Sequence, residues 1–444
     1  MRGTLRIRKY GLRRLFHVWS CAKLVGELLM PDRHPSTSPS GNGGTTSQSP
    51  SASFSEFSSV SPRAEWARLH AGFVYVGIVT ILLGPLLPYL VRHWSLSDSQ
   101  AGFLFTAEYS GGVFGNVLTG LLLPRLGFSK VMVIAFLGFA LGFSFLGAGP
   151  WIFACLLIFI YGVALGLSVP SSNLRGTQLP SANTAAAVSL LNLSWGVGAV
   201  LCPLLIAVLL PSLGLRGFST SLCVLALLFA GLYYLRPIKS SAPVKQPPTR
   251  SLDVWLAKLR HAPAIPLLVL FFFYVGVETA IGGWAAAYEK RMPGMESTAW
   301  TLAPSVFYSF LLIGRGITPL ILRRFSQMSV AVGGLLCAAS GAIILTFSHA
   351  SSPLHVGAAL AGLGLAPQYP LYVTWLADAF REDANWLGAL YFGSAGLGGA
   401  VIPWLVGIIA YRTNSLRVGL ILPAAVIAVM FFFLLRMRPR SVPA

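Results

Sequence analysis

The sequence carries little charge for its length. Only 10% of its 444 residues are Asp, Glu, Lys or Arg, and only 13 are acidic, whereas soluble domains carry about 25% charged residues. Hydrophobic residues make up 55%. A soluble protein of this size needs a charged surface, and a disordered one needs few apolar residues, so the composition excludes both classes. It predicts a protein that is solvated by a lipid bilayer.

Cysteine and histidine are also scarce. The five cysteines show no CxxC spacing, and the seven histidines lie in tails or near the ends of apolar segments. Disulfide frameworks and metal sites need such residues in clusters. No glycine-rich run contains the Gly-Lys-Ser/Thr of an ATP-binding loop. We therefore expect no metal, no cofactor and no enzyme activity.

Apolar segments of about 20 residues recur from Leu69 onward, and each is long enough to cross about 30 Å of hydrocarbon as a helix. One long connection, residues 237–262, separates the first six from the last six. The sequence therefore predicts an all-α membrane protein with twelve transmembrane helices. Their expected bounds are 69–91, 98–121, 129–148, 151–173, 186–210, 217–236, 263–288, 298–320, 328–348, 353–379, 386–411 and 415–436.

Five regions follow from this division. Residues 1–66 are expected to form a disordered cytoplasmic tail, because the stretch from Pro35 to Pro62 is rich in Ser, Pro, Gly and Thr. A six-helix bundle at 67–236, a cytoplasmic linker at 237–262, a second bundle at 263–436 and a short tail at 437–444 complete the chain. Met30 remains an alternative start to Met1.

The two halves repeat each other at an offset close to 199 residues. Residues 75–80 (YVGIVT) align with 274–279 (YVGVET), and Gly196, Gly198 and Pro203 align with Gly396, Gly398 and Pro403 at 200. Because six spans is an even number, both copies insert in the same orientation and form two parallel repeats. This duplication predicts a transporter that works by alternating access, and we expect a monomer.

The net charge of +19 reflects orientation in the membrane, because the basic residues are spread over tails and connections rather than gathered on one face for nucleic acid. With both termini cytoplasmic, inside loops and the C-terminal tail hold 15 Lys and Arg, and outside loops hold six. Cytoplasmic loops carry the excess of positive charge. We therefore predict a multi-pass protein of the plasma (inner) membrane with cytoplasmic N- and C-termini.

The loop after the second span, residues 120–130 (GLLLPRLGFSK), together with the duplication, resembles the major facilitator superfamily and its G-x-x-x-D-R-x-G-R-K signature. Arg125, Gly127 and Lys130 fit, whereas Pro124 replaces the usual Asp. Residues 274–288 and the Asn173, Asn192 and Trp195 region resemble the fucose permease and sodium-dependent glucose transporter branch. The acidic residues that serve proton coupling in fucose permease are replaced here by Gly84 and Val169.

Charged residues inside membrane spans are costly and point to function. Glu108 and Glu278 each lie about ten residues from the predicted outer end of their spans, one in each half, so both are coupling candidates. The alternative is that each carboxylate holds a neighbouring helix. Arg315 is expected about 10 Å deeper than Glu278 by helix rise, where it braces the inner gate with Asn116, Arg125, Lys130 and Arg324. An anion-binding role for Arg315 also stays open.

Aromatic and amide side chains suit a sugar site, since amides bind hydroxyl groups and aromatic rings stack on sugar C–H faces. Each of them also fits helix packing or interface anchoring. The substrate-cavity candidates are Tyr75, Asn173, Asn192, Trp195, Trp284, Gln368 and Tyr369.

These features predict a secondary-active transporter that moves a small polar solute, favouring a sugar, together with a coupling ion, proton or sodium. An exporter of lipophilic compounds or drugs is the alternative within transport, because the acids of fucose permease are missing. A transporter-like membrane sensor is the alternative outside transport.

Overall fold

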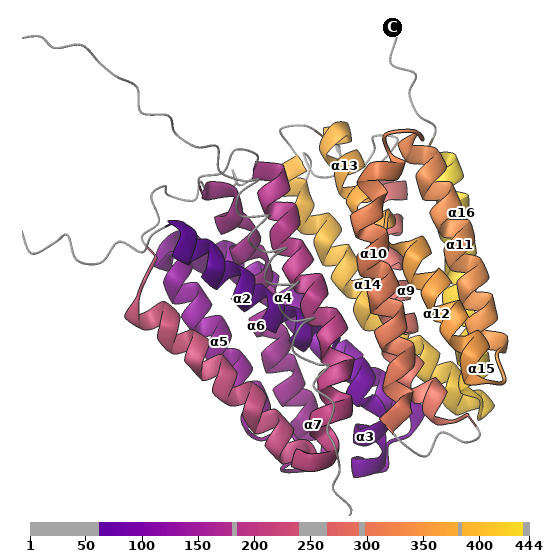
Figure 1. Ribbon diagram of the computed structural model, residues 1–444, viewed down its shortest axis with the longest axis horizontal. Coiled ribbons are helices and arrows are strands. Elements are labelled where there is room, and N and C mark those ends of the chain that lie inside the picture. Colours follow the sequence, from indigo (N-terminus) through magenta and orange to yellow (C-terminus); the bar gives the residue numbers. More distant parts are fainter. Residues whose placement is uncertain (1–61, 180–183, 239–263, 293–297, 381–383, 438–444) are drawn as a thin grey trace, which may run out of the picture.

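The structure, a computed structural model, describes residues 62–179, 184–238, 264–292, 298–380 and 384–437. These residues form helices and turns, with no strand in the ranges given. Figure 1 shows the helices of the first half and those of the second half as two groups side by side. The predicted tail up to residue 61, most of the linker and residues 438–444 lie outside the described residues.

Six helical elements make up the first half: α2 (Pro62–Ile81), α3 (Leu83–Trp94), α4 (Asp98–Leu126), α5 (Phe128–Ser144), α6 (Trp151–Gln178) and α7 (Thr184–Leu235). The backbone of α7 leaves helical geometry at Gly214, whose φ of 63° and ψ of −179° divide it into two helices. A glycine suits this position because a side chain at that φ is strained.

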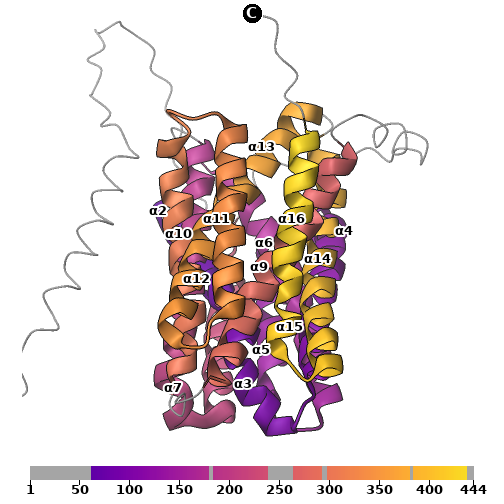
Figure 2. The same ribbon diagram turned by 90° about the vertical axis from the view of Figure 1, so that its right-hand side faces the viewer.

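Nine elements make up the described second half: α9 (Ala264–Lys290), the 3₁₀ turn η1 (Thr298–Thr301), α10 (Leu302–Ile321), α11 (Gln327–Phe347), α12 (Ser351–Leu365), α13 (Gln368–Phe380), α14 (Ala384–Thr413), α15 (Leu416–Gly419) and α16 (Ile421–Arg436). The view turned by 90° shows that the long helices run in the same general direction through the molecule (Figure 2).

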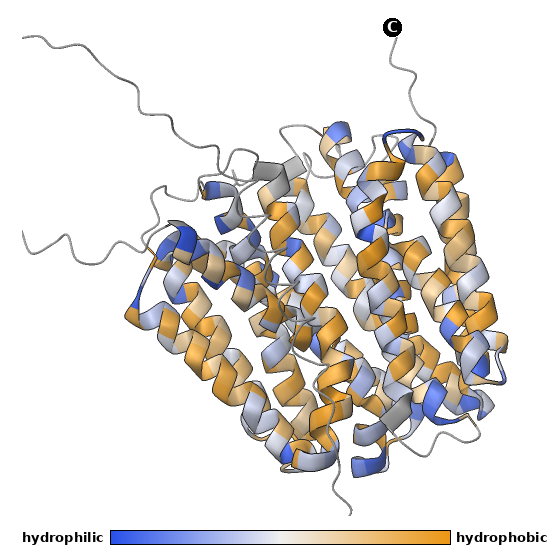
Figure 3. Ribbon diagram, viewed as in Figure 1, coloured by the Kyte–Doolittle hydropathy of each residue, from blue (hydrophilic) through white to orange (hydrophobic). Residues whose placement is uncertain are grey.

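Seven of the described helices are long and apolar enough to cross a membrane, and the bent pair α2–α3 brings this number to eight. Hydrophobic residues dominate these helices along most of their length (Figure 3). Large apolar side chains such as Val208, Leu228 and Ile152 are more than 60% exposed. Exposed surface of this kind is stable in hydrocarbon and unfavourable in water.

The first helix of the bundle is broken beside Pro85. The axes of residues 63–81 and 83–94 differ by 44°, because Pro85 has no N–H to donate to the carbonyl of Ile81, four residues earlier. Thr80 and Ile81 therefore lie at the bend. The helix also begins at Pro62, and its Glu65 is buried against Arg175 Nε at 2.5 Å. Residues 62–66 thus belong to the bundle, which corrects their assignment to a disordered tail.

Equivalent glycines allow equivalent helix crossings in the two halves. A Cβ atom on Gly198 of α7 would lie 2.0 Å from the carbonyl oxygen of Val74 in α2, and one on Gly398 of α14 would lie 1.8 Å from that of Phe272 in α9. Both distances are far below van der Waals contact. The absence of a side chain therefore lets each pair of backbones touch.

The two halves meet closely at the end of the bundle that contains α3. There Arg291 forms an ion pair with Asp98, with Nη1 3.0 Å from Oδ2, and Gly84 of α3 packs on Gly283 of α9. Further along, Thr106 Oγ1 donates to the carbonyl of Ala400 at 2.8 Å. We call this the α3 end. These contacts hold α3 and α4 against α9 and α14 and position the pocket described next.

Candidate functional site

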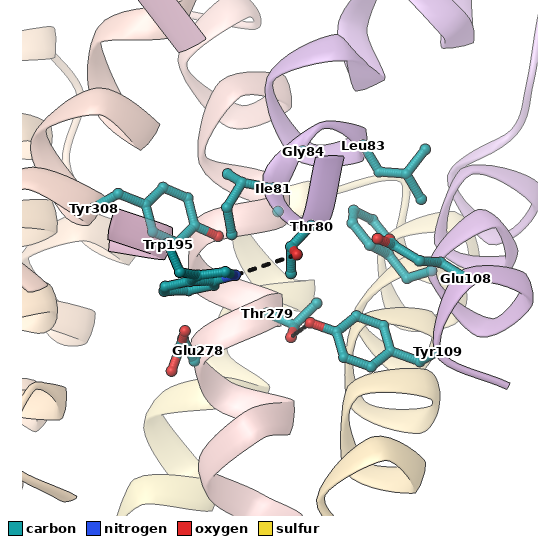
Figure 4. Close-up of a pocket in the computed structure, with 12 residues that line it drawn as sticks. Thr80, Ile81, Leu83, Gly84, Glu108, Tyr109, Trp195, Glu278, Thr279 and Tyr308 are labelled. Atoms are coloured by element: carbon teal, nitrogen blue, oxygen red, sulfur yellow. Dashed lines mark hydrogen bonds between the residues drawn. The ribbon is translucent and has the colours of Figure 1, made fainter. Parts of the chain in front are cut away.

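A small pocket with both polar and apolar lining residues lies between the two halves, beyond the contacts of the α3 end. Five elements besides α4 contribute to it: α2, α3 and α7 from the first half, and α9 and α10 from the second. Figure 4 shows its polar side chains together with the Thr80–Trp195 hydrogen bond. The lining consists of Thr80, Ile81, Leu83, Gly84, Phe105, Glu108, Tyr109, Trp195, Glu278, Thr279, Gly283 and Tyr308.

Both predicted coupling residues line this pocket. Figure 4 shows Glu278 on the side of Trp195 and Glu108 on the opposite side. Their helices, α4 and α9, belong to different halves, so the fold brings together two carboxyl groups that lie 170 residues apart in the sequence. Their surroundings differ, however, and the difference determines what each group can do.

Glu278 is paired with a cation. Arg315 of α10 places Nη2 3.5 Å from Glu278 Oε2 and 3.1 Å from the hydroxyl oxygen of Tyr274. Its guanidinium carbon also lies 5.3 Å from the centre of the Trp195 ring, across the boundary between the halves. Arg315 Nε is buried without a hydrogen-bond partner among the described residues. A donor therefore remains available beside an aromatic ring and a carboxylate.

This arrangement corrects the sequence-based position of Arg315. Helix rise placed it about 10 Å deeper than Glu278, in an inner gate. The long side chain reaches back to Glu278 instead, because α10 runs beside α9 and presents Arg315 to the face that carries Tyr274 and Glu278. Arg315 therefore belongs to the surroundings of the pocket.

Glu108 has a different environment. It is 3% exposed, and its Oε1 atom has no hydrogen-bond partner in the described part of the chain. Its backbone lies against Gly162 of α6, where a Cβ atom would approach the Glu108 carbonyl oxygen to 2.2 Å. Close packing therefore holds a carboxyl group in a mostly apolar place without a cation.

Hydroxyl groups connect the halves around the two acids. Tyr109 and Thr279 share a hydrogen bond of 2.7 Å between α4 and α9. Trp195 Nε1 donates to Thr80 Oγ1 at 3.3 Å, and Thr80 Oγ1 donates to the carbonyl of Val76 at 2.7 Å. The sequence analysis did not select Thr80, Tyr109 or Tyr308. The aligned threonines of the repeat, Thr80 and Thr279, were the signal that pointed to this position.

Three of the cavity candidates lie elsewhere. Tyr75 donates to the carbonyl of Leu222 at 3.0 Å within the first half, and Trp284, 0% exposed, donates to that of Pro403 at 3.0 Å. Gln368, also 0% exposed, donates to the carbonyl of Ala331 at 2.9 Å. Their polar atoms are occupied by backbone groups in the core. In this structure the three side chains pack helices together and do not line the pocket.

The other cavity candidates lie outside the lining as well, except for Trp195. The Tyr369 ring packs at a tilt against that of Tyr274, with ring centres 5.6 Å apart, and does not line the pocket. Asn192 Nδ2 donates to Asn173 Oδ1 at 2.8 Å, and this amide pair is exposed. The gate candidates Asn116, Arg125, Lys130 and Arg324 are exposed at the helix surfaces and ends. Gly127 has a φ of 77°, which suits the turn between α4 and α5.

Residues 69–385 match the sequence model of the Major Facilitator Superfamily. The chain belongs to this superfamily. The predicted resemblance is thereby confirmed, and the protein is a multi-pass integral membrane transporter rather than an enzyme. All twelve residues that line the pocket fall within the matched range.

Among similar proteins is the glucose/mannose transporter GlcP of Bacillus subtilis, which is 22% identical over 81% of this chain and 92% of its own length. The human sodium-dependent glucose transporter 1 is 20% identical over 79% of this chain and 74% of its own length. The solved structure of the E. coli fucose:proton symporter FucP covers 85% of this chain and all of its own, with a TM-score of 0.60 and 19% identity. The nucleoside transporter NupG reaches a TM-score of 0.71 at 13% identity, over 84% of this chain and all of its own. At these identities the two structures establish the fold.

Proposed function

We propose that this protein is a secondary-active sugar transporter of the plasma membrane that works by alternating access and is coupled to an ion. The observation that carries the proposal is the pocket between the halves, whose lining combines Glu278, paired with Arg315 behind it, with the Trp195 ring and several hydroxyl groups. Names of similar proteins that mention glucose, mannose and fucose support the choice of a sugar.

The charges around the pocket favour a neutral solute. Arg315 balances Glu278 across 3.5 Å, so this side of the pocket carries no net charge. A sugar hydroxyl group can accept a hydrogen bond from the free Arg315 Nε and donate one to a Glu278 oxygen. Trp195 offers an aromatic surface of the kind that stacks on sugar rings. A lipophilic compound forms no hydrogen bonds with these donors and acceptors. It would bury them without partners, and this cost weakens the binding of such a compound.

The twelve-span, two-repeat arrangement is part of this proposal. We take α2–α3, α12–α13 and α15–α16 as one span each, the two parts of α7 as two spans, and α4, α5, α6, α9, α10, α11 and α14 as the others. The equivalent crossings at Gly198 and Gly398 support the duplication. Two bundles, 67–236 and 263–436, then move relative to each other about the pocket, with the linker and both tails in the cytoplasm. We expect a monomer.

The excess of basic residues in the predicted inside loops supports an outward-facing position for the α3 end. The Asp98–Arg291 and Gly84–Gly283 contacts then close the outer side. The exposed Asn173–Asn192 pair lies toward the cytoplasm in this orientation. We therefore infer that the outer side is shut in this conformation and that opening of these contacts gives access from outside.

Counterflow in proteoliposomes tests the proposal. Vesicles that contain the purified protein and unlabelled glucose, mannose or fucose should take up the labelled form of the transported sugar transiently, whereas protein-free vesicles should not. Trp195→Ala should raise the sugar concentration for half-maximal counterflow about tenfold, or ~1.4 kcal/mol. Trp375→Ala is the matched control, because Trp375 lies outside the pocket and donates to Gln327 at 2.6 Å.

Absence of counterflow for every sugar, with uptake of a lipophilic dye instead, would favour the exporter. Binding without any transport would favour a sensor. An equal effect of the two tryptophan substitutions would remove Trp195 from the solute site while leaving sugar transport in place.

A further inference from the structure

Glu108 stands out because it lies in the pocket without a charge partner. It is 3% exposed and its Oε1 atom has no hydrogen-bond partner within the residues that the structure describes. An unpaired ionised carboxylate in such a place costs several kcal/mol. The group therefore needs either a proton or a bound cation in this conformation.

The groups that face Glu108 do not include a cation. They are Tyr109 on its own helix, Tyr161 on α6, Cys202 on α7 and Tyr308 on α10. Glu278 on α9 shares the pocket but is itself an acid, and the guanidinium of Arg315 is bound to Glu278 and Tyr274. Within the described residues, no cation is paired with Glu108.

A bound sodium ion is poorly suited to neutralise the Glu108 carboxylate. Hard cations require several oxygen ligands at once. In the pocket, the Tyr109 and Thr279 hydroxyls are bonded to each other, and the Thr80 hydroxyl is bonded to Trp195 and to the carbonyl of Val76. Of the remaining side-chain oxygens in the lining, those of Glu278 belong to the pair with Arg315, which leaves Glu108 itself and the Tyr308 hydroxyl, fewer than a hard cation takes. A proton needs no further ligand, because the neutral acid alone satisfies the electrostatic requirement.

We propose that Glu108 is the proton-binding group that couples transport in this protein, and that Glu278 with Arg315 serves the solute. This inference rests on the proposed transport function. Burial disfavours the charged form of a carboxyl group, so the closed α3 end accepts Glu108 only as the neutral acid. One proton is bound before the outer side closes and is released after the pocket opens to the cytoplasm. No covalent bond is formed or broken.

A direct transport measurement tests the coupling. With one proton per sugar, a gradient of one pH unit is worth about 1.4 kcal/mol and supports about tenfold accumulation. Wild-type proteoliposomes should approach this ratio without sodium. Glu108→Gln keeps the shape of the side chain but cannot titrate, so its accumulation ratio should fall to about one while counterflow stays within about twofold of wild type.

Glu289→Gln is the matched control. Glu289 is also fully buried, but its oxygens are satisfied by His355 Nε2 at 2.6 Å and Ala303 N at 2.9 Å, outside the pocket. This variant should still accumulate sugar. Accumulation by Glu108→Gln at the wild-type ratio overturns the proposal, and so does wild-type accumulation that follows a sodium gradient and ignores the pH gradient.

Infrared spectroscopy tests the site without any solute. The C=O stretch of a buried protonated carboxylic acid should be present in the wild type at neutral pH, absent in Glu108→Gln and retained in Glu278→Gln. If the Gln variant does not fold, Glu108→Asp should shift this band. If the acid band of the wild type is unchanged in both Glu108→Gln and Glu108→Asp, the proton site is refuted. If no sugar shows counterflow but the acid band is assigned to Glu108, the proposal of a sugar substrate is refuted and the proton site stands.

Discussion

The two halves use the same helix crossings but carry different charges at equivalent positions. Gly198 and Gly398 allow matching backbone contacts, whereas Glu278 and Arg315 correspond, at an offset of 199, to Val79 and Asn116 in the first half. Glu108 corresponds in the same way to Phe307. Packing is thus repeated and ionisable chemistry is not. Duplication supplies a symmetric frame, and the departures from it indicate where the two halves have separate tasks.

The backbone shows the same kind of departure. Pro85 and Trp284 are equivalent at the same offset, yet Pro85 lies at a bend of 44° between α2 and α3 while α9 runs unbroken from Ala264 to Lys290. The bend brings Gly84 against Gly283 across the boundary. Trp284 in the straight copy packs into the core instead. One half therefore has a bent helix at this position, and the other has a straight helix that supports the core.

The largest effect is expected from removal of this support. Trp284→Ala should lower the free energy of unfolding by about 3–5 kcal/mol, because a fully buried ring and its hydrogen bond to Pro403 are lost. Unfolding of the purified protein, followed by tryptophan fluorescence or thermal shift, measures this. The sugar affinity of the folded fraction should remain that of the wild type. Reduced affinity at normal stability would return Trp284 to the solute site.

A second, somewhat smaller effect separates Arg315 from its repeat partner. Arg315→Ala leaves Glu278 without its cation and should reduce counterflow about 100-fold, or ~2.7 kcal/mol, whereas Asn116→Ala, at the equivalent exposed position, should change it little. Glu278→Gln added to Arg315→Ala removes the uncompensated charge and should restore part of the folded yield. Equal losses for Arg315→Ala and Asn116→Ala would contradict the functional difference between the halves.

Much of the fold was accessible from the sequence, because apolar segment length and the repeat report directly on membrane helices. Glu108 and Glu278, the predicted coupling candidates, both line the pocket, and they could be found because charges in apolar segments are conspicuous; Trp195, a predicted cavity residue, lines it as well. Tyr75, Trp284 and Gln368 were assigned to the cavity because residue type does not reveal direction. Half a helical turn decides whether an aromatic or amide side chain meets solute or backbone.

Arg315 illustrates the other limit. Its depth was estimated from the rise per residue, which locates the backbone, whereas the guanidinium lies several bonds away and follows the packing of α10 on α9. From the sequence, Glu108 and Glu278 were likewise both predicted to be coupling residues. Only the three-dimensional environment distinguishes a paired Glu278 from an unpaired Glu108.

The smallest effect is expected at the α3 end, where the halves are joined by charge rather than by packing. The Arg291 side chain is 41% exposed, so its pair with Asp98 is screened by water and contributes up to about 1 kcal/mol. Asp98→Asn should therefore shift the equilibrium toward outer opening by fivefold or less and leave the unfolding free energy unchanged. Labelling of a cysteine introduced at Leu83 measures opening, because Leu83 lines the pocket and is 1% exposed when the end is closed. High salt should produce the same shift in the parent and none in Asp98→Asn. Labelling that is unchanged by the substitution and by salt would show that the glycine contact alone closes this end.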